Sequence, residues 1–167
     1  MIAGPNVSRN LADISHAKPR SREGLDISAL RRYGIDNIWL YYHILQLKWT
    51  VLLDSTFEPE FEALPTEVQD ELLAHAKLLE IFGPQLGRPR ADTLKGSRHA
   101  NMKELRFDAA DGVWRIAFAF DPTRNAIFLV AGDKAGTSEK RFYKRLISKA
   151  DERFDEHLKR SEGIKRR

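Results

Sequence analysis

No cysteine occurs among the 167 residues of the chain. A disulfide framework, a thiolate zinc site and a thiol nucleophile are therefore excluded. Long apolar runs are also missing, because the most apolar stretch, residues 37–49, falls short of the ~20 residues that span a bilayer and contains His43 and Gln46. The polar start of the chain does not resemble a secretory signal. We therefore expect a cytoplasmic protein with no membrane partner.

The sequence also lacks the short motifs of common cofactor and metal enzymes. HExxH, P-loop and GxSxG patterns do not occur, and no pair of carboxylates has catalytic spacing. No cluster of metal ligands is visible either. We therefore expect neither a cofactor nor a metal, which leaves chemistry that cationic side chains and a phenol can support, such as binding or cleavage of a phosphodiester.

Charge is distributed unevenly along the chain. The net charge is only +4, but residues 54–82 carry eight acids against one base, Lys77. Residues 86–106 carry six bases against two acids, and residues 140–167 carry eleven bases against five acids. This separation favours a polyanionic partner. A solvated, highly charged last helix explains the basic end of the chain equally well.

Three segments are expected along the chain. Residues 1–47 form an N-terminal extension, partly disordered or helical, because Gly-Pro and Lys-Pro breaks interrupt it and no period is sustained. Residues 48–160 form the folded domain, and residues 161–167 form a basic tail.

The folded domain shows alternation typical of strands and the 3.6-residue period of helices. Strands are predicted at residues 49–53, 102–107, 113–120 and 126–131, and helices at residues 57–64, 66–82 and from Ser138 onward. Residues 85–100 have the composition of a loop. Thr66 and Gln69 have the spacing of a capping box. The apolar face of the last helix is predicted to consist of Tyr143, Ile147, Ala150, Phe154 and Leu158.

This order of elements predicts an α+β fold. An antiparallel sheet of about four strands should carry a helical hairpin on one face, together with a C-terminal helix. The hairpin should cover the aromatic face of strand 113–120. The opposite face should stay partly open and present Arg115, Arg106 and Glu104.

Cations gather at the predicted sheet and in the loop before it. They are Lys103, Arg106, Arg115 and Lys134 on the sheet or its edges, and Lys95 and Arg98 in the loop. Arginine holds phosphate oxygens with two donors, whereas lysine acts as a point charge. RNA cleavage needs a base for the 2′-hydroxyl, cations on the phosphate and an acid for the leaving oxygen. A structural role is the stronger interpretation for Arg115, and phosphate binding is the stronger one for Arg106 and Lys134.

Two further side chains could take part in such chemistry. Tyr143, at the start of the last helix, is either a core aromatic or a group that stacks on a base or donates a proton. His99 is the only histidine of the basic loop and histidine is the usual general base, although a lone surface histidine is more often simply solvated. Lys140 and Lys144 add positive charge near Tyr143 and are candidates for RNA binding.

Together, several stretches resemble one protein family. They are LGRP (residues 86–89), LKGSRHANMKELR (residues 94–106), WRIAFAFDP (residues 114–122), GDK (residues 132–134) and RFY (residues 141–143). In this order and spacing they are similar to the phage-derived Gp49-like, HigB-type branch of the RelE/ParE toxin superfamily. The resemblance covers residues 49–158, about two thirds of the chain.

The resemblance implies a fold and a function. The fold would be an antiparallel sheet with helices packed on it. The protein would be the toxin of a type II toxin–antitoxin pair and would cut mRNA on the ribosome without metal, with the substrate's own 2′-hydroxyl as nucleophile. Its partners would be a helix-turn-helix antitoxin of the HigA type, the ribosome and mRNA.

The functional positions of the superfamily carry over one at a time. The catalytic arginine falls on Arg106, the basic residue after the last strand on Lys134, and the tyrosine of the last helix on Tyr143. The family's lysines match Lys95 and Lys103, and an arginine common in the third strand matches Arg115.

This sequence departs from the family pattern in three places. RelE itself has arginine where Lys134 stands, and His157 is out of register with the C-terminal histidine of some HigB toxins. Residues 1–47 have no counterpart, which favours an upstream segment included by a wrong start codon over a genuine appendage.

Two other functions remain open from the sequence. One is a non-catalytic or gyrase-type inhibitory binding protein of the same fold, and Arg106, Lys134 and Tyr143 together argue against it. The other is a general RNA-binding module, which the lack of spaced exposed aromatics on the sheet disfavours.

Overall fold

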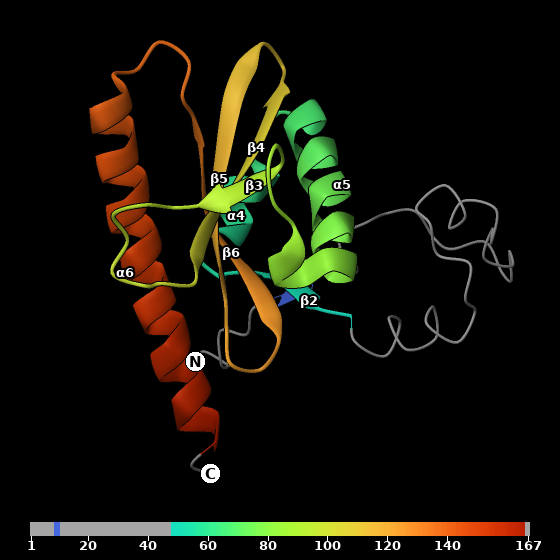
Figure 1. The fold of residues 1–167 in the computed structure, drawn as a ribbon, viewed down its shortest axis with the longest axis vertical. Helices are drawn as coiled ribbons and strands as arrows, with labels where there is room; N and C mark the ends of the chain where they lie inside the picture. The colour runs from blue at the N-terminus through green and yellow to red at the C-terminus, as the bar shows by residue number, and fades with distance from the viewer. Residues whose placement is uncertain (1–8, 11–47, 166–167) are drawn as a thin grey trace, which may run out of the picture.

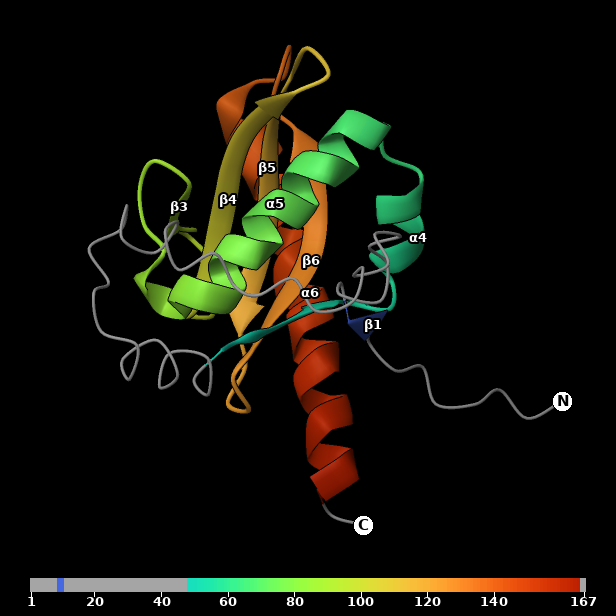
Figure 2. The ribbon, with the colours of Figure 1, turned by 90° about the vertical axis from the view of Figure 1, so that its right-hand side faces the viewer.

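The structure, a computed structural model, describes residues 9–10 and 48–165. Within these residues one sheet carries helices on both faces, and the predicted α+β class is confirmed (Figures 1 and 2). The elements are β1 (Arg9–Asn10), β2 (Thr50–Leu53), α4 (Glu58–Glu62), α5 (Thr66–Phe82), the 3₁₀ turn η1 (Gly83–Gln85), β3 (Ala91–Thr93), β4 (Met102–Ala109), β5 (Gly112–Phe120), β6 (Asn125–Asp133) and α6 (Glu139–Lys165).

Most of the predicted N-terminal extension, residues 1–8 and 11–47, lies outside the described residues. Its residues Arg9 and Asn10 form β1, which pairs antiparallel with β2. At the other end, α6 continues to Lys165 and so includes most of the segment predicted as a basic tail.

The sheet has the strand order β1-β2-β6-β5-β4-β3. The predicted antiparallel meander is present as β4, β5 and β6, at the centre of the sheet in Figure 2. β2 runs parallel to β6, which makes the sheet mixed. The prediction of a plain loop at residues 85–100 is wrong, because β3 lies inside it and pairs with β4. Three residues are too few for strand alternation to be recognised in the sequence.

The hairpin of α4 and α5 covers the aromatic face of the sheet, as predicted (Figure 2). Ile116 and Phe118 from β5 pack there with Leu72 and Leu79 from α5, and all four are fully buried. At the end of α5, Gly83 adopts φ 50°, and a Cβ there would lie 2.1 Å from Nε1 of Trp49. Only glycine at this position leaves room for the ring of Trp49, which packs at this end of the core.

The predicted capping box of α5 does not form. The N-cap of α5 is Pro65, without a side-chain cap hydrogen bond, and Thr66 is already the first residue of the helix. Gln69 donates its side-chain amide to the carbonyls of Leu64 (2.8 Å) and Glu62 (3.3 Å). Gln69 thus satisfies carbonyl groups at the end of α4 rather than an N–H group of α5.

Most of the opposite face of the sheet is covered by α6, so less of it is open than the predicted partly open face implies. Small residues on β5, Ala117 and Ala119, let the helix approach closely. The buried apolar face of α6 is rotated from the predicted one and consists of Phe142, Leu146, Ala150 and Phe154. Tyr143, Ile147 and Leu158 are half-buried at its flank. Only the end of this sheet face near Arg106 and Arg115 remains accessible.

Ion pairs tie α6 to the rest of the fold. Arg153 donates to Glu60 of α4 (2.5 Å) and to the carbonyl of Leu129 (2.6 Å). Arg160 donates to the buried Asp54 (2.6 Å). Part of the positive charge of the last helix is therefore neutralised by the acidic segment, and a polyanion need not be invoked to explain it.

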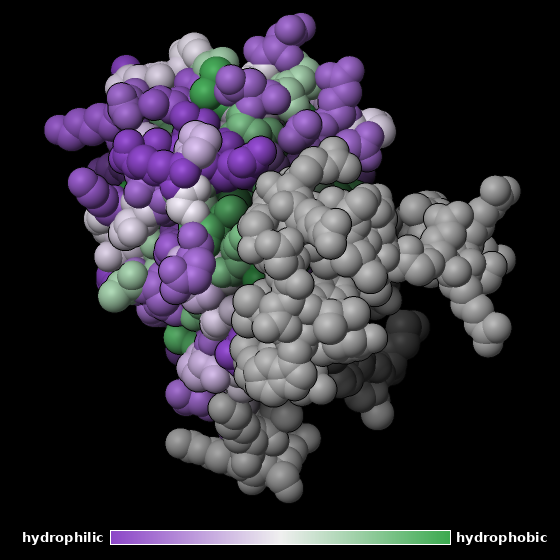
Figure 3. All heavy atoms as spheres, turned by 45° about the vertical axis from the view of Figure 1, so that its right-hand side comes forward, coloured by the Kyte–Doolittle hydropathy of each residue, from purple (hydrophilic) through white to green (hydrophobic). Residues whose placement is uncertain are grey.

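The described surface gives no sign of a membrane-spanning element. No helix among residues 48–165 is long and apolar enough to cross a bilayer. Figure 3 shows hydrophilic side chains over most of the described surface on that side, with apolar residues in small patches. The apolar residues are used mainly in the two cores on either side of the sheet.

Candidate functional site

A shallow groove of about 240 Å³ lies between the β3–β4 end of the sheet and the first turn of α6. It is lined by Arg88, Asp92, Thr93, Leu94, Lys95, Glu104, Arg106, Glu139 and Tyr143. The groove thus brings together residues that are up to 55 positions apart in the sequence, from Arg88 to Tyr143. Three of the predicted site residues, Lys95, Arg106 and Tyr143, are among them.

Arg106 is the central cation of the groove. It donates to Oε1 of Glu104 from Nε (2.9 Å) and Nη2 (2.6 Å), and Nη2 lies 3.3 Å from Asp92. The hydrogen bonds to Glu104 and the neighbouring charges raise the pKa of Arg106 above its ordinary value, so it stays charged. Arg88 donates to Asp92 (2.6 Å), and this bond holds the pKa of Asp92 below its usual 3.8. A row of alternating charges results, with Arg106 fixed in one orientation.

Glu104 lies under this row and is almost wholly buried. Its Oε2 has no hydrogen-bond partner and lies 4.0 Å from Nε of Arg115, which is also unpartnered. Arg115 is opposite Arg106 across β4 and β5, and its Nη1 donates to the carbonyl of Trp114 (2.8 Å). With a side chain only 14% exposed, Arg115 fits the structural role that was the stronger interpretation of its position.

Lys134 and Tyr143 lie together at the side of the groove. Nζ of Lys134 is 5.5 Å from the centre of the Tyr143 ring and 3.1 Å from Oε1 of Glu139. The approach of α6 to β6 depends on Gly132, because a Cβ there would lie 2.9 Å from the ring of Phe142. The Gly-Asp-Lys sequence at the end of β6 therefore sets the helix close enough for Tyr143 to border the groove.

Lys103 is not brought to the groove. It alternates with Glu104 and Arg106 along β4 and so points to the opposite face of the sheet. Its Nζ donates to the carbonyl of Pro84 in η1 (3.1 Å). The catalytic role assigned to Lys103 by resemblance finds no support in this geometry.

Arg98 and His99 are bound to the middle of α6 instead of to the groove. Arg98 donates to Asp155, and Nε2 of His99 lies 2.8 Å from the same carboxylate. Burial alone would raise the pKa of Asp155, but these two hydrogen bonds outweigh burial and lower it. His99 also packs edge-on against Phe154. Both residues anchor the β3–β4 loop, and His99 is partly buried against α6.

Lys140 and Lys144 are exposed on the outer side of α6. Lys144 lines a second shallow hollow with Arg141, Arg145 and the Gly136–Ser138 turn. These cations extend the positive surface away from the groove without contacting Arg106.

Two carboxylates of the groove, Asp92 and Glu139, were not predicted from the sequence. Asp92 and Glu139 pair with Arg106 and Lys134 respectively, and Arg88 holds Asp92. The LGRP stretch could have indicated that Arg88 belongs to the groove. Glu139 could have been recognised by its position on the first turn of the helix that carries Tyr143. Asp92 gave none, because β3 was not recognised.

The described residues contain no group of three or more histidines and carboxylates arranged to hold a metal ion. His157 lies 3.2 Å from the buried Asp121 and stacks on Phe154, so it belongs to the core beneath α6. The groove can therefore supply cations, carboxylates and one phenol.

Comparison with known proteins gives relatives over the same region. Residues 59–155, more than half of the chain, match the family described as phage derived protein Gp49-like. A Mycobacterium tuberculosis protein named "Putative toxin HigB2" is 48% identical over 103 residues, covering 61% of this chain and 51% of the relative. Another from the same organism, named "Putative toxin HigB3", is 43% identical over 113 residues, covering 68% of this chain and 96% of the relative.

The chain thus spans about half the length of the first relative and nearly all of the second. No solved structure matches it. The matched region contains the groove and strands β3 to β6, and it ends within α6. The predicted resemblance is confirmed, and the chain belongs to the phage-derived Gp49-like family of HigB-type toxins.

Proposed function

We propose that this protein is the toxin of a type II toxin–antitoxin pair and acts as a ribosome-dependent mRNA endonuclease. The observation that carries the proposal is the convergence of Arg106, Lys134 and Tyr143 around one groove. They come from β4, the turn after β6 and the first turns of α6. Family membership supports the same activity, and an intracellular substrate agrees with a cytoplasmic location.

The groove suits cleavage of an RNA phosphodiester. In this reaction the 2′-hydroxyl loses its proton to a base and its oxygen attacks phosphorus. The bond to the 5′-oxygen breaks and that oxygen takes up a proton, so that a 2′,3′-cyclic phosphate and a 5′-hydroxyl form. Charge accumulates on the phosphate oxygens in the transition state, and fixed cations stabilise it. Arg106 is held by Glu104 with donors available to a phosphate, while Lys134 adds a point charge.

Tyr143 has two roles that its position allows. Its half-buried ring can stack on a base next to the scissile bond, and its hydroxyl can give a proton to the leaving 5′-oxygen. Lys134 lies over the ring, with Nζ 5.5 Å from its centre, and so keeps a cation beside the scissile phosphate in either role.

In the free protein, carboxylates form ion pairs with the cations that would bind the phosphate. Asp92 contacts Arg106, and the exposed Glu139 contacts Lys134. Both are side chains at the rim and can rotate away, whereas the buried Glu104 cannot. We therefore assign Glu104 to positioning Arg106, and Asp92 and Glu139 to contacts that RNA replaces.

A helix-turn-helix antitoxin of the HigA type is the proposed protein partner. The adjacent cations Lys140, Arg141, Lys144 and Arg145 offer complementary potential to an acidic segment. The neighbouring gene should encode this partner, and its product should co-purify with the protein and relieve growth arrest.

The direct test is cleavage of a translated reporter mRNA by the purified protein, mapped by primer extension with and without ribosomes. We expect cuts within translated codons that require ribosomes. Growth-arrested cells with intact transcripts would contradict the proposal and favour the non-catalytic or gyrase-type inhibitor, which a DNA supercoiling assay would then identify.

A further inference from the structure

Arg88 lies at the rim of the groove, on the turn that leads into β3. The N–H groups of Arg90 and Ala91 both donate to the carbonyl of Gly87 (3.2 and 3.0 Å), which fixes the backbone of this turn. The side chain of Arg88 is 71% exposed, and among the described residues only Asp92 pairs with it. Its guanidinium group can therefore follow a ligand that enters the groove.

One carboxylate oxygen joins the two arginines of the groove. Oδ2 of Asp92 lies 2.6 Å from Nη2 of Arg88 and 3.3 Å from Nη2 of Arg106. The other oxygen, Oδ1, accepts a hydrogen bond from the N–H of Thr93 (2.9 Å). Donors from two arginines and a backbone amide thus converge on a single anionic group, and phosphate groups are bound in proteins by the same kinds of donor.

The carboxylates of Asp92 and Glu104 are held differently. Glu104 is almost wholly buried and accepts two hydrogen bonds from Arg106. The side chain of Asp92 is 22% exposed, and that of its partner Arg88 lies mostly in solvent. Exposed ion pairs of this kind contribute little to stability. An anion that enters the groove can therefore take the place of Asp92, whereas Glu104 stays beneath Arg106.

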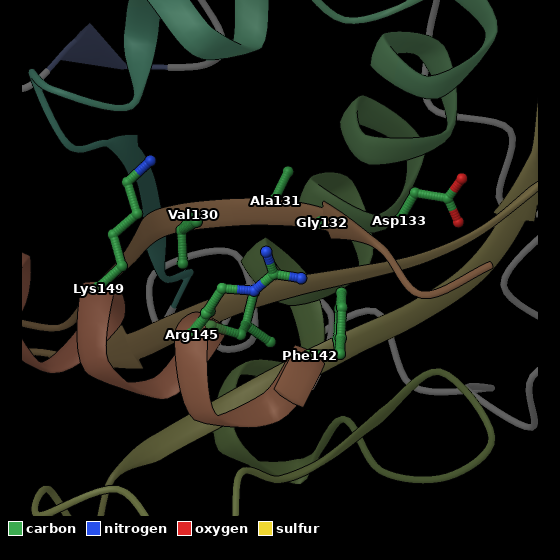
Figure 4. A pocket seen from close by; sticks show the side chains of 8 residues that line it. Val130, Ala131, Gly132, Asp133, Phe142, Arg145 and Lys149 are labelled. Carbon is green, nitrogen blue, oxygen red and sulfur yellow. The ribbon is translucent and has the colours of Figure 1, made fainter. Parts of the chain in front are cut away.

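A second hollow, between α6 and β6, also contains cations but is built differently (Figure 4). Arg145 and Lys149 line it, and Figure 4 shows the carboxylate of Asp133 pointing away from Arg145. Oδ1 of Asp133 accepts the backbone N–H groups of Val113 (2.9 Å) and Ala135 (2.8 Å). That carboxylate fixes the backbone. A hollow with several cations thus does not by itself bring a carboxylate between two guanidinium groups.

We propose that Arg88 is a further catalytic residue, which binds the scissile phosphate together with Arg106 once the phosphate has displaced Asp92. In the free protein, Oδ2 of Asp92 marks the position that a phosphate oxygen takes between the two guanidinium groups. The inference rests on the proposed function and deepens it, because two arginines instead of one then contact the reacting phosphate.

Charge predicts the stage of the reaction at which Arg88 acts. A phosphodiester and the carboxylate of Asp92 each carry one negative charge, so their exchange in the substrate complex gains little Coulomb energy. As the 2′-oxygen attacks, a second negative charge develops on the phosphate oxygens, and the two guanidinium groups stabilise it. Loss of Arg88 should therefore lower kcat more than it raises KM.

The first test measures kcat and KM of ribosome-dependent cleavage by the full chain. Arg88→Ala should lower kcat at least about tenfold and change KM less than about threefold, because one charge-assisted hydrogen bond to the transition state is lost. Lys77→Ala removes one positive charge from the exposed surface of α5, on the other face of the sheet, and should leave both constants within about twofold. An unchanged kcat in Arg88→Ala would overturn the proposal.

A double variant distinguishes contact with the phosphate from an indirect role. Arg88→Ala combined with Asp92→Asn should keep the loss in kcat, because the contact between Arg88 and the phosphate is still missing. Recovery of the unchanged rate in the double variant would show that Arg88 only holds Asp92 away from Arg106. That result would overturn the proposal.

Binding of inorganic phosphate separates this inference from the proposed function. In ¹H–¹⁵N spectra of the full chain, the Nε–Hε signals of Arg88 and Arg106 should shift together as phosphate is added. The half-saturating concentration should fall at least about threefold in Asp92→Asn, which lacks the competing charge. An Arg106 signal that responds equally in Arg88→Ala overturns the inference, even if the unchanged protein cleaves mRNA. Absence of cleavage by the unchanged protein, with both signals still shifting, refutes the proposed function and with it the catalytic role of Arg88.

Discussion

The two faces of the sheet are built on different principles. Under α5 the core is apolar and aromatic, and His75 is its only buried polar residue among the described ones. Under and around α6 the core contains or adjoins six buried polar or charged residues, namely Asp54, Glu104, Asp121, Asp151, Arg153 and His157. The α5 face therefore supplies hydrophobic stability, and the α6 face holds charges in fixed positions.

This difference explains where the groove can lie. Fixed cations that meet a phosphate need buried carboxylates to orient them, as Glu104 orients Arg106. Such pairs are costly to bury and depend on good geometry. They are confined to the face whose helix is itself anchored by ion pairs through Arg153 and Arg160.

Apart from the loss expected for Arg106→Ala, the largest expected effect is a loss of catalysis at the α6 face. Tyr143→Phe keeps the ring but removes the proton, and we expect cleavage to fall about 10²-fold, the lower range for loss of a general acid. Ribosome-dependent cleavage rates of the purified proteins measure this. Full activity of the phenylalanine variant would restrict Tyr143 to stacking.

The next prediction compares how much the α5 core and the ion pairs of α6 contribute to the free energy of unfolding. Leu72→Ala, under α5, should cost about 2–5 kcal/mol because it leaves a cavity. Arg153→Met, on α6, should cost about 1–3 kcal/mol through the lost bonds to Glu60 and the Leu129 carbonyl. Urea unfolding measures both. Equal stability of the methionine variant and the unchanged protein would show that the ion pairs on α6 contribute nothing net.

A smaller effect is expected on the stability of the fold at low pH. Burial alone would raise the pKa of Asp121, but hydrogen bonds from Asn125, His157 and Thr123 outweigh burial and hold it below its usual 3.8. Because the folded-state pKa is lower than the unfolded one, the stabilisation is present above about pH 4 and is lost as the pH falls further. Asp121→Asn should flatten this decline, and Thr123→Val should flatten it less. An unchanged slope for Asp121→Asn would contradict the assignment.

The smallest effect is expected at the far edge of the sheet. Deletion of residues 1–46 removes β1, whose two residues pair only with β2. We expect cleavage to persist and stability to fall slightly. Aggregation or loss of ribosome-dependent cleavage would show that the extension belongs to the working fold.

The sequence predicted the α5 face better than the α6 face, for a physical reason. Alternation in Trp114–Phe120 and the helical period of Val68, Leu72 and Leu79 record apolar burial directly. On α6, charged residues are buried as well, and the period of apolar residues therefore predicts the wrong face. It predicts a face with Tyr143 and Ile147, whereas the helix packs on the sheet with Phe142 and Leu146.

The candidate site was predicted in part. Arg106, Lys134, Tyr143 and Lys95 lie together, as family resemblance implied. Lys103 lies apart from them, because successive residues of a strand face opposite sides of the sheet and the groove lies on the side of Glu104 and Arg106. Asp92 and Glu139 could not be recognised, since a pairing across strands or between a turn and a helix leaves no local sequence pattern.

We propose that cleavage takes place in the groove around Arg106, on the α6 face of the sheet. Arg106 and Lys103 lie three residues apart on β4 and point to opposite faces, so they form a matched pair of cations. Ribosome-dependent cleavage should fall about 10²–10³-fold in Arg106→Ala and stay within about twofold of the unchanged rate in Lys103→Ala. A comparable loss in both variants, or a larger loss in Lys103→Ala, would contradict this account of the site.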